Sequence, residues 1–198
     1  MEPASRVPFI GLTGGMGAGK SEALSALGEL GAATLSTDAV VHELLGTGEI
    51  RDALVERFGA DIAPDGAVDR AKVGERVFAD PAEREWLEEQ LWPKVGQRVT
   101  EWKEESARSG PVAAVVEVPL LFEAGMEGAF DHTVAVVADE ITREHRAAQR
   151  GHAGVASRHD RQLSQDEKAQ RADFVVRNDG TREELKHALS RVLAKIGA

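Results

Sequence analysis

The stretch GLTGGMGAGKSE, residues Gly11–Glu22, decides the fold of this chain. Glycine loses more backbone entropy on folding than any other residue, so a run this dense in glycine indicates that the backbone itself is needed here. From Gly14 to Ser21 the stretch satisfies the pattern G-x-x-x-x-G-K-[ST]. The apolar run FIGLT precedes the pattern and a helical pattern follows it. This strand, loop and helix predict a phosphate-binding loop (P-loop).

The physical demands of phosphate binding explain the pattern. Successive backbone N–H groups must converge on phosphate oxygens, and side chains in the loop would obstruct them. The helix that starts near Lys20 adds the positive end of its dipole. We expect Lys20 to place its charge on the transferred phosphate and the Ser21 hydroxyl to ligate magnesium. The loop therefore predicts nucleotide binding but leaves the phosphate acceptor open.

The composition is that of an ordinary globular protein, with 42% hydrophobic and 29% charged residues. There is no cysteine, which excludes disulfides and thiolate metal sites and favours a cytoplasmic location. The formal net charge of −10 argues against non-specific nucleic-acid binding, because such a surface repels polyphosphate backbones. The N-terminus has no signal-peptide pattern, and no apolar run is long enough to span a membrane.

Five short apolar runs rich in Val and Ile predict strands that are buried on both faces of a parallel sheet. These runs are Val7–Leu12, Ala32–Leu35, Val112–Val118, Thr133–Ala138 and Phe174–Val176. Helical patterns lie between them; the first, Ser21–Leu30, carries leucines three residues apart and ends at Gly31. The alternation predicts an α/β fold in which helices flank a parallel sheet.

Two segments interrupt this alternation. Residues 49–110 are charged and lack a convincing strand, so they predict an inserted helical region within a single domain of 198 residues. Within the insert, turn-forming residues are expected to separate short helices. These residues are Pro64, Gly66, Pro81 and Pro93. The second segment, residues 141–172, is arginine-rich and weakly apolar, and we expect it to form a lid.

The lid segment is basic in an acidic chain. Between Thr142 and Arg161 the local net charge is +3, and Arg143, Arg146 and Arg150 share one face of the expected helix. Such a face beside a nucleotide can close over the phosphates and neutralise the charge that spreads during phosphoryl transfer. The alternative is a solvated charged face.

Asp38 follows the second predicted strand, in ATLSTDAVVHELL. Ligands of open α/β sheets gather at the carboxyl ends of the strands, so a carboxylate there is placed to take a proton from an attacking hydroxyl. Alternatively, Asp38 caps the helix expected over Ala39–Leu45. The third strand ends in Glu117 rather than in the Asp of a typical magnesium-binding strand, which argues against a motor protein or a switch GTPase.

The chain resembles the dephospho-CoA kinases, a P-loop kinase family. Four stretches carry the resemblance: GLTGGMGAGKS, FGADIAPDGAVDRAKVGERVFADPAEREWLE, VEVPLLFEAG and RQLSQDEKAQRADFVVRNDGT. The VPLLFE and DGAVDR segments are more specific to this family than the loop is. The resemblance implies a P-loop NTPase-type fold, with ATP and Mg²⁺ as cofactors and dephospho-CoA as a small-molecule acceptor. It also implies the reaction, transfer of the γ-phosphate to the ribose 3′-hydroxyl in the last step of coenzyme A biosynthesis.

The resemblance also implies roles for particular residues. Asp38 matches the family's catalytic aspartate, and Lys20, Arg146 and Arg150 would act with it in catalysis. The acceptor would contact Asp38, Arg70, Pro119, Leu120 and Leu121. ATP would contact Gly14, Gly17, Ala18, Gly19, Lys20, Ser21, Glu22 and Asn178. Gln162 and Lys168 match further positions of the family.

The chain departs from the family pattern at four places. Ser36-Thr37-Asp38 stands where the family usually has Asp-Ala-Asp, so we expect Asp38 to carry the acid–base task alone. Glu22 replaces a commoner Thr, Trp92 replaces the usual His, and Arg143 replaces a common Gln. Two other functions stay open: a kinase of another small acceptor such as a nucleoside monophosphate, and a nucleotide-dependent regulator. The oligomeric state is open as well, with a monomer favoured.

Overall fold

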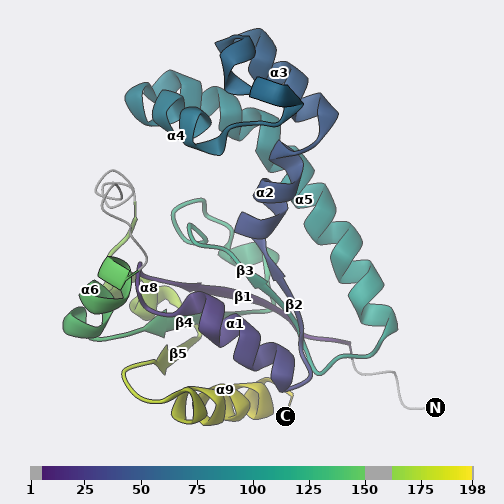
Figure 1. The fold of residues 1–198 in the computed structure, drawn as a ribbon. Coiled ribbons are helices and arrows are strands. Elements are labelled where there is room, and N and C mark those ends of the chain that lie inside the picture. The colour runs from purple at the N-terminus through teal and green to yellow at the C-terminus, as the bar shows by residue number, and fades with distance from the viewer. Residues whose placement is uncertain (1–5, 150–161, 198) are drawn as a thin grey trace. The chain divides into compact units, whose positions relative to one another are not determined.

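The computed structural model describes residues 6–149 and 162–197 of the chain and divides the chain into two compact units. The first unit comprises Met1–Ser36 and Lys103–Ala198, and the second comprises Thr37–Trp102. Each unit has a hydrophobic core of its own. Figure 1 shows the sheet of the first unit and the helices of the second.

A five-stranded parallel sheet forms the centre of the first unit, with the strand order β2-β3-β1-β4-β5. Its strands are β1 (Phe9–Gly14), β2 (Ala33–Ser36), β3 (Ala114–Glu117), β4 (His132–Val137) and β5 (Phe174–Arg177). All five overlap the apolar runs that predicted them, with ends that differ by at most two residues. The prediction that all five are buried on both faces is wrong for the edge strands β2 and β5, which are only partly buried because each has a neighbour on one side alone. All six residues of the central strand β1 are buried, as expected of a strand covered on both faces.

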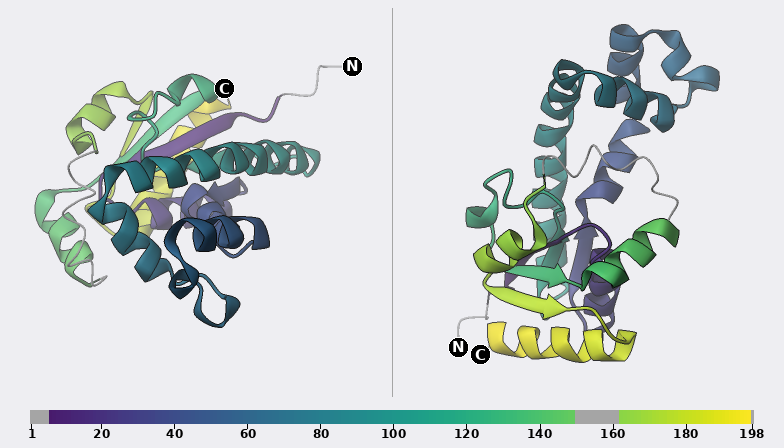
Figure 2. Two further views of the ribbon diagram at one scale, coloured as in Figure 1. Left: turned by 90° about the horizontal axis from the view of Figure 1, so that it is seen from above. Right: turned by 90° about the vertical axis from the view of Figure 1, so that its left-hand side faces the viewer.

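Helices cover the sheet of the first unit. On one face, α1 (Lys20–Glu29) packs against α9 (Arg182–Ile196), and their apolar side chains form a core with those of the strands. Another helix, α8 (Gln165–Arg171), packs against β1 and β4. Figures 1 and 2 show α8 on the opposite face of the sheet from α9. The predicted α/β architecture, a parallel sheet flanked by helices, is confirmed.

The loop of residues 15–19 connects β1 to α1 and therefore lies at the carboxyl edge of the central strand, where ligands of parallel sheets bind. The helix after the loop begins at Lys20 and ends at Glu29, one residue earlier at each end than the periodicity predicts. Gly31 follows it with a φ of 91°, the left-handed conformation that commonly ends a helix.

The second unit is helical. It contains α2 (Thr37–Leu45), α3 (Gly48–Phe58), α4 (Arg70–Ala79) and residues 81–102 of α5 (Pro81–Arg108). Its core is formed mainly by side chains from α3, α4 and α5. The unit begins at Thr37 and ends at Trp102, whereas the sequence predicts an insert over 49–110. That the two units make one kinase domain stays a prediction.

The prediction that Pro93 separates two helices is wrong, because Pro93 lies inside the 28-residue helix α5. A proline removes one backbone donor and crowds the preceding turn. Here, buried side chains on both sides of it, Leu87, Leu91 and Val95, hold the helix in place. In the part of the chain that the structure describes, no helix is long and apolar enough to cross a membrane.

Candidate active site

Atoms of neighbouring segments lie very close to the backbone of the loop. Gly17 and Gly19 have φ values of 74° and 90°, in the left-handed region that favours glycine. A Cβ atom on Gly17 would lie 2.5 Å from the carbonyl oxygen of Arg143, in α6 (Glu140–Gln149). A Cβ atom on Gly19 would collide with the side-chain amide of Asn178. Conformation and close approach thus both require glycine at these two positions.

We expect Gly17→Ala to lower the free energy of unfolding by about 1–3 kcal/mol, the usual range for a residue held in an unfavourable backbone conformation. The new methyl group would also press on the backbone of α6. Urea denaturation followed by circular dichroism measures the change.

Gly96→Ala is the matched control for this substitution. Gly96 lies within α5, and apart from its chain neighbours and the adjacent backbone of its own helix, no described atom lies within 4 Å of the position of its added Cβ. Alanine is a better helix former than glycine, so Gly96→Ala is expected to raise the free energy of unfolding by about 0.5–1 kcal/mol. Equal effects of the two substitutions would contradict the argument for Gly17.

Lys20 lies at the first position of α1, and its ammonium group folds over the loop. Lys20 Nζ donates to the carbonyl oxygens of Gly14 and Gly15, both at 3.1 Å. The next residue, Ser21, is exposed in the first turn of α1. The structure therefore brings together a lysine, a hydroxyl and the glycine backbone, the groups that the sequence assigns to the phosphates.

Asn178 connects the loop to the end of β5. It is 2% exposed, and its backbone N–H donates to the carbonyl oxygen of Val137 at 2.8 Å. Its side-chain Nδ2 donates to the carbonyl oxygen of Ala18 at 3.0 Å and to Glu22 at 3.5 Å. Its carbonyl oxygen accepts from Arg146 Nη1 at 3.0 Å. Asn178 thus holds the loop through its hydrogen bond to Ala18. Its contact with the nucleotide stays a prediction.

The first turn of α6 is fixed by Asp139. The hydroxyl and the N–H of Thr142 donate to its carboxylate at 2.6 and 2.8 Å, and these bonds lower the pKa of Asp139 below its ordinary value. A lowered pKa means that these bonds stabilise the fold above the ordinary pKa and lose their effect as the pH falls through the lowered one. The N–H of Asp139 also donates to Asp179, in the segment after β5.

A buried ion pair supports the segment that follows β3. Lys168 of α8 is fully buried, and its Nζ lies 2.9 Å from Glu123 Oε1 and donates to the carbonyl oxygen of Pro119 at 2.6 Å. The same carbonyl oxygen accepts from the Thr13 hydroxyl at 3.3 Å. Leu121 is 0% exposed. Pro119 is thus anchored through its carbonyl from β1 and α8, and contacts of Pro119, Leu120 and Leu121 with the acceptor stay predictions.

We expect Lys168→Met to lower the free energy of unfolding by about 3–5 kcal/mol, because it leaves the largely buried Glu123 carboxylate without its partner. Lys186→Met is the control, since Lys186 pairs with Glu29 at 3.0 Å on the surface, where ion pairs contribute little. Urea denaturation of both variants compares them. A loss at Lys168 as small as that at Lys186 would contradict the structural role of the buried pair.

The second unit holds two predicted acceptor residues, Asp38 in α2 and Arg70 in α4. Asp38 is the second residue of α2 and is exposed. His42 lies one turn further on the same face, and its Nδ1 lies 2.5 Å from Nη1 of Arg70 in α4. Because α2 begins at Thr37, Asp38 lies inside its first turn and not at the capping position before Ala39. Arg70 therefore contacts α2 at His42, one helical turn after Asp38.

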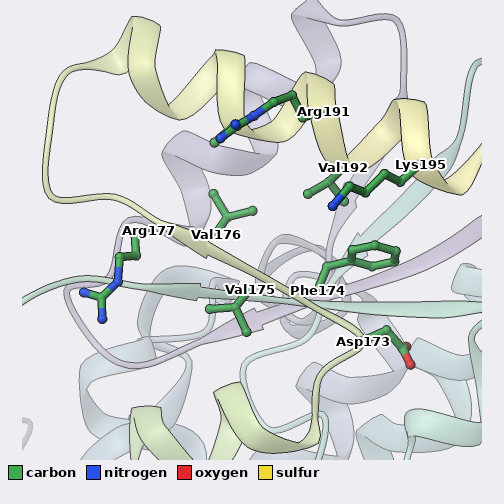
Figure 3. A pocket seen from close by; sticks show the side chains of 9 residues that line it. Asp173, Phe174, Val175, Val176, Arg177, Arg191, Val192 and Lys195 are labelled. Carbon is green, nitrogen blue, oxygen red and sulfur yellow. The ribbon is translucent and has the colours of Figure 1, made fainter.

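The structure does not place every predicted site residue, and it holds a groove that the site does not use. Arg150 lies outside the described residues, so its predicted place on the lid helix stays a prediction. A groove of about 640 Å³ lies between β5 and α9 (Figure 3). None of the nine described residues that line it is a predicted site residue, so this groove is separate from the loop.

Several residues that shape the site were not predicted from the sequence. The side-chain amide of Gln165 bonds both ways with the backbone of Ala138, at 2.9 and 2.8 Å, and holds the end of β4. Thr13 and Glu123 anchor the Pro119 segment. Thr13 and Glu123 lie within the stretches that carry the family resemblance, and this is the signal that could have found them.

A parallel sheet whose central strand leads through a glycine loop into a helix headed by lysine and serine defines the P-loop class of phosphate-binding proteins. A family model described as dephospho-CoA kinase matches residues 8–184. The chain belongs to the dephospho-CoA kinase family. The resemblance and the fold class that the sequence predicts are therefore confirmed.

Known proteins match nearly the whole chain. A dephospho-CoA kinase from Anaeromyxobacter dehalogenans is 40% identical over 192 residues, which cover 94% of this chain and 91% of the relative. The structure of TT1252 from Thermus thermophilus is 31% identical, with a TM-score of 0.79, and covers 97% of this chain and 99% of its own. A dephospho-CoA kinase from Campylobacter jejuni has a TM-score of 0.69 over 96% of both chains; at 22% identity, that likeness is one of fold.

Proposed function

We propose that the protein is a kinase that transfers the γ-phosphoryl group of ATP to the ribose 3′-hydroxyl of dephospho-CoA, the last step of coenzyme A biosynthesis. The observation that carries this proposal is the family match over residues 8–184. The loop supports it, because its glycine backbone, Lys20 and Ser21 have the arrangement that binding of a triphosphate requires.

The loop has the task of holding and polarising ATP. Its backbone N–H groups and the first turn of α1 bind the phosphate oxygens, as helix N-termini do for anions. Lys20 neutralises charge on the transferred phosphoryl group. Asn178 and Arg146 keep the loop in shape, through the hydrogen bonds to Ala18 and to the Asn178 carbonyl.

The residues present fit a magnesium ion that arrives with the nucleotide. Mg²⁺ in kinases is held by a few protein oxygens together with substrate phosphates, and the exposed Ser21 hydroxyl offers one such oxygen. Among the described residues, no group of three or more His, Asp or Glu side chains forms a separate metal site. When bound, Mg²⁺ supplies positive charge at the phosphate oxygens.

Asp38 and Arg70 are proposed to serve the acceptor. A guanidinium group binds phosphate well, so Arg70 suits the diphosphate of dephospho-CoA. Asp38, one helical turn from the partner of Arg70, suits the role of base for the acceptor hydroxyl.

In the proposed transfer the 3′-oxygen forms a bond to the γ-phosphorus, and the bond from that phosphorus to the β–γ bridging oxygen breaks. ADP leaves, and Asp38 takes the proton of the 3′-hydroxyl. Lys20 stabilises the charge on the phosphoryl group as it moves, together with Arg146 and Arg150, which the family resemblance assigns to catalysis.

The test is direct. Purified protein is incubated with Mg-ATP and dephospho-CoA, and mass spectrometry is expected to detect CoA and ADP in equal amounts. Reactions without acceptor, and with nucleoside monophosphates in its place, are the controls. Faster phosphorylation of a nucleoside monophosphate would favour a kinase of another small acceptor. Hydrolysis of ATP at the same rate with and without acceptor would favour a nucleotide-dependent regulator. Either result would overturn the proposal.

Three properties accompany this proposal and stay predictions: a monomeric state, a cytoplasmic location and the absence of a nucleic-acid partner. The net charge of −10 supports the last of these. The cysteine-free sequence supports the second.

A further inference from the structure

Arg143 of α6 lies against the phosphate-binding loop. A Cβ atom built on Gly15 would lie 3.3 Å from Arg143 Nη1, and the carbonyl oxygen of Arg143 is the atom that a Cβ on Gly17 would meet. Both the side chain and the backbone of this residue therefore line the loop. Figure 1 shows α6 beside the end of β1 from which the loop begins.

The guanidinium group of Arg143 is incompletely hydrogen-bonded in the described part of the chain. Its Nε atom is buried and makes no hydrogen bond there. A buried polar group of this kind is costly unless it is hydrogen-bonded, and a charged one more so. An anion is the partner that would satisfy it.

The neighbouring arginine is arranged differently. Arg146 Nη1 donates to the carbonyl oxygen of Asn178, so one donor of its guanidinium group already has a partner within the protein. Arg143 and Lys20 instead meet at Gly15, since Lys20 Nζ donates to the carbonyl oxygen of that residue. Two cations converge on one end of the loop.

We propose that Arg143 binds the terminal phosphate of the nucleotide, the same group that Lys20 polarises, and thereby makes the site select triphosphates over diphosphates. The guanidinium offers a fork of donors that matches phosphate oxygens. Arg146 also orders the loop, through its bond to the carbonyl oxygen of Asn178. This inference rests on the proposed function, because it requires a nucleotide in the loop.

The test measures nucleotide affinity by calorimetry. Arg143→Gln is compared with the unaltered protein, using Mg²⁺ with ADP and Mg²⁺ with a non-hydrolysable ATP analogue. Loss of one charge-assisted hydrogen bond predicts an analogue Kd that rises about tenfold, while the Kd for ADP rises less than about twofold. Arg143→Lys keeps the charge and is expected to recover part of the loss.

Arg191→Gln is the matched control, because Arg191 lies on α9 beside the separate groove and carries the same charge. It is expected to leave both affinities unchanged. Unchanged analogue affinity in Arg143→Gln would overturn the inference. Equal weakening of ADP and analogue, with a lower melting temperature, would also overturn it and assign Arg143 a structural role.

The failure of the inference differs from the failure of the proposed function. If the unaltered protein binds both nucleotides but makes no CoA, the proposed function fails, and the ratio of the two affinities still decides the role of Arg143. If the unaltered protein makes CoA and Arg143→Gln keeps its analogue affinity, the inference alone fails. If the unaltered protein binds neither nucleotide, both fail.

Discussion

Lys20→Met is expected to lower the kcat for CoA formation by about a hundred- to a thousandfold, the loss found when one preorganised charged donor is removed from a transition state. Methionine keeps the length of the side chain and removes its charge. The ammonium group of Lys20 lies over the loop at 3.1 Å from two of its carbonyl oxygens, where the phosphates are proposed to bind. The glycine backbone would still bind nucleotide, so the loss should appear in kcat more than in the KM for ATP.

The measurement is the steady-state rate of ADP release with dephospho-CoA, together with the melting temperature of the variant. Lys195→Met on α9 is the control, since it removes the same charge from an exposed position beside the separate groove. A Lys20 variant that keeps more than about a tenth of the kcat would contradict the role of Lys20 in stabilising the transferred group.

The loop and its flanking strand and helix are predictable from sequence because their signals are local. A run of apolar residues, a glycine pattern and leucines three residues apart each mark one element within a few positions. The same holds for the other four strands. Burial of β3 on both faces leaves the continuous run VAAVVEV, which contains this strand, and the structure places β3 between β2 and β1.

The contacts that shape the loop leave no local signal. Asn178 donates to the carbonyl oxygen of Ala18 across 160 residues of sequence. The sequence around either residue gives no sign of this contact. Arg143 is similar, because its charge is visible in the sequence but its approach to Gly15 depends on where α6 packs. Distant contacts of this kind follow from the assembled fold.

The second unit shows where local signals mislead. Pro93 predicts a break, but burial of Leu87, Leu91 and Val95 outweighs one lost hydrogen bond. Asp38 is recognised through the family pattern, whereas its neighbourhood with Arg70 depends on His42, which the sequence gives no reason to select. The chemical role of a single residue is thus easier to predict from sequence than the residues with which it is in contact.

Asp38→Asn is expected to lower kcat by about a hundred- to ten-thousandfold, the range in which a positioned general base contributes, while the Kd for ATP changes less than twofold. The asparagine amide has nearly the shape of the carboxylate but does not accept the proton of the 3′-hydroxyl. Asp38 is exposed in the first turn of α2, so the substitution should leave the melting temperature unchanged. Steady-state turnover, calorimetric ATP binding and thermal unfolding measure the three quantities.

Glu43→Gln is the matched control for this prediction, because it removes one carboxylate from an exposed position of the same helix. It is expected to keep full turnover, since its nearest cation, at 3.9 Å, is the surface residue Arg98. If Asp38→Asn turns over as fast as Glu43→Gln, Asp38 is not the base, and proton removal must fall to water or to the departing phosphate. If turnover falls only together with ATP affinity, Asp38 acts on the nucleotide instead, and the acceptor site of the second unit loses its main support.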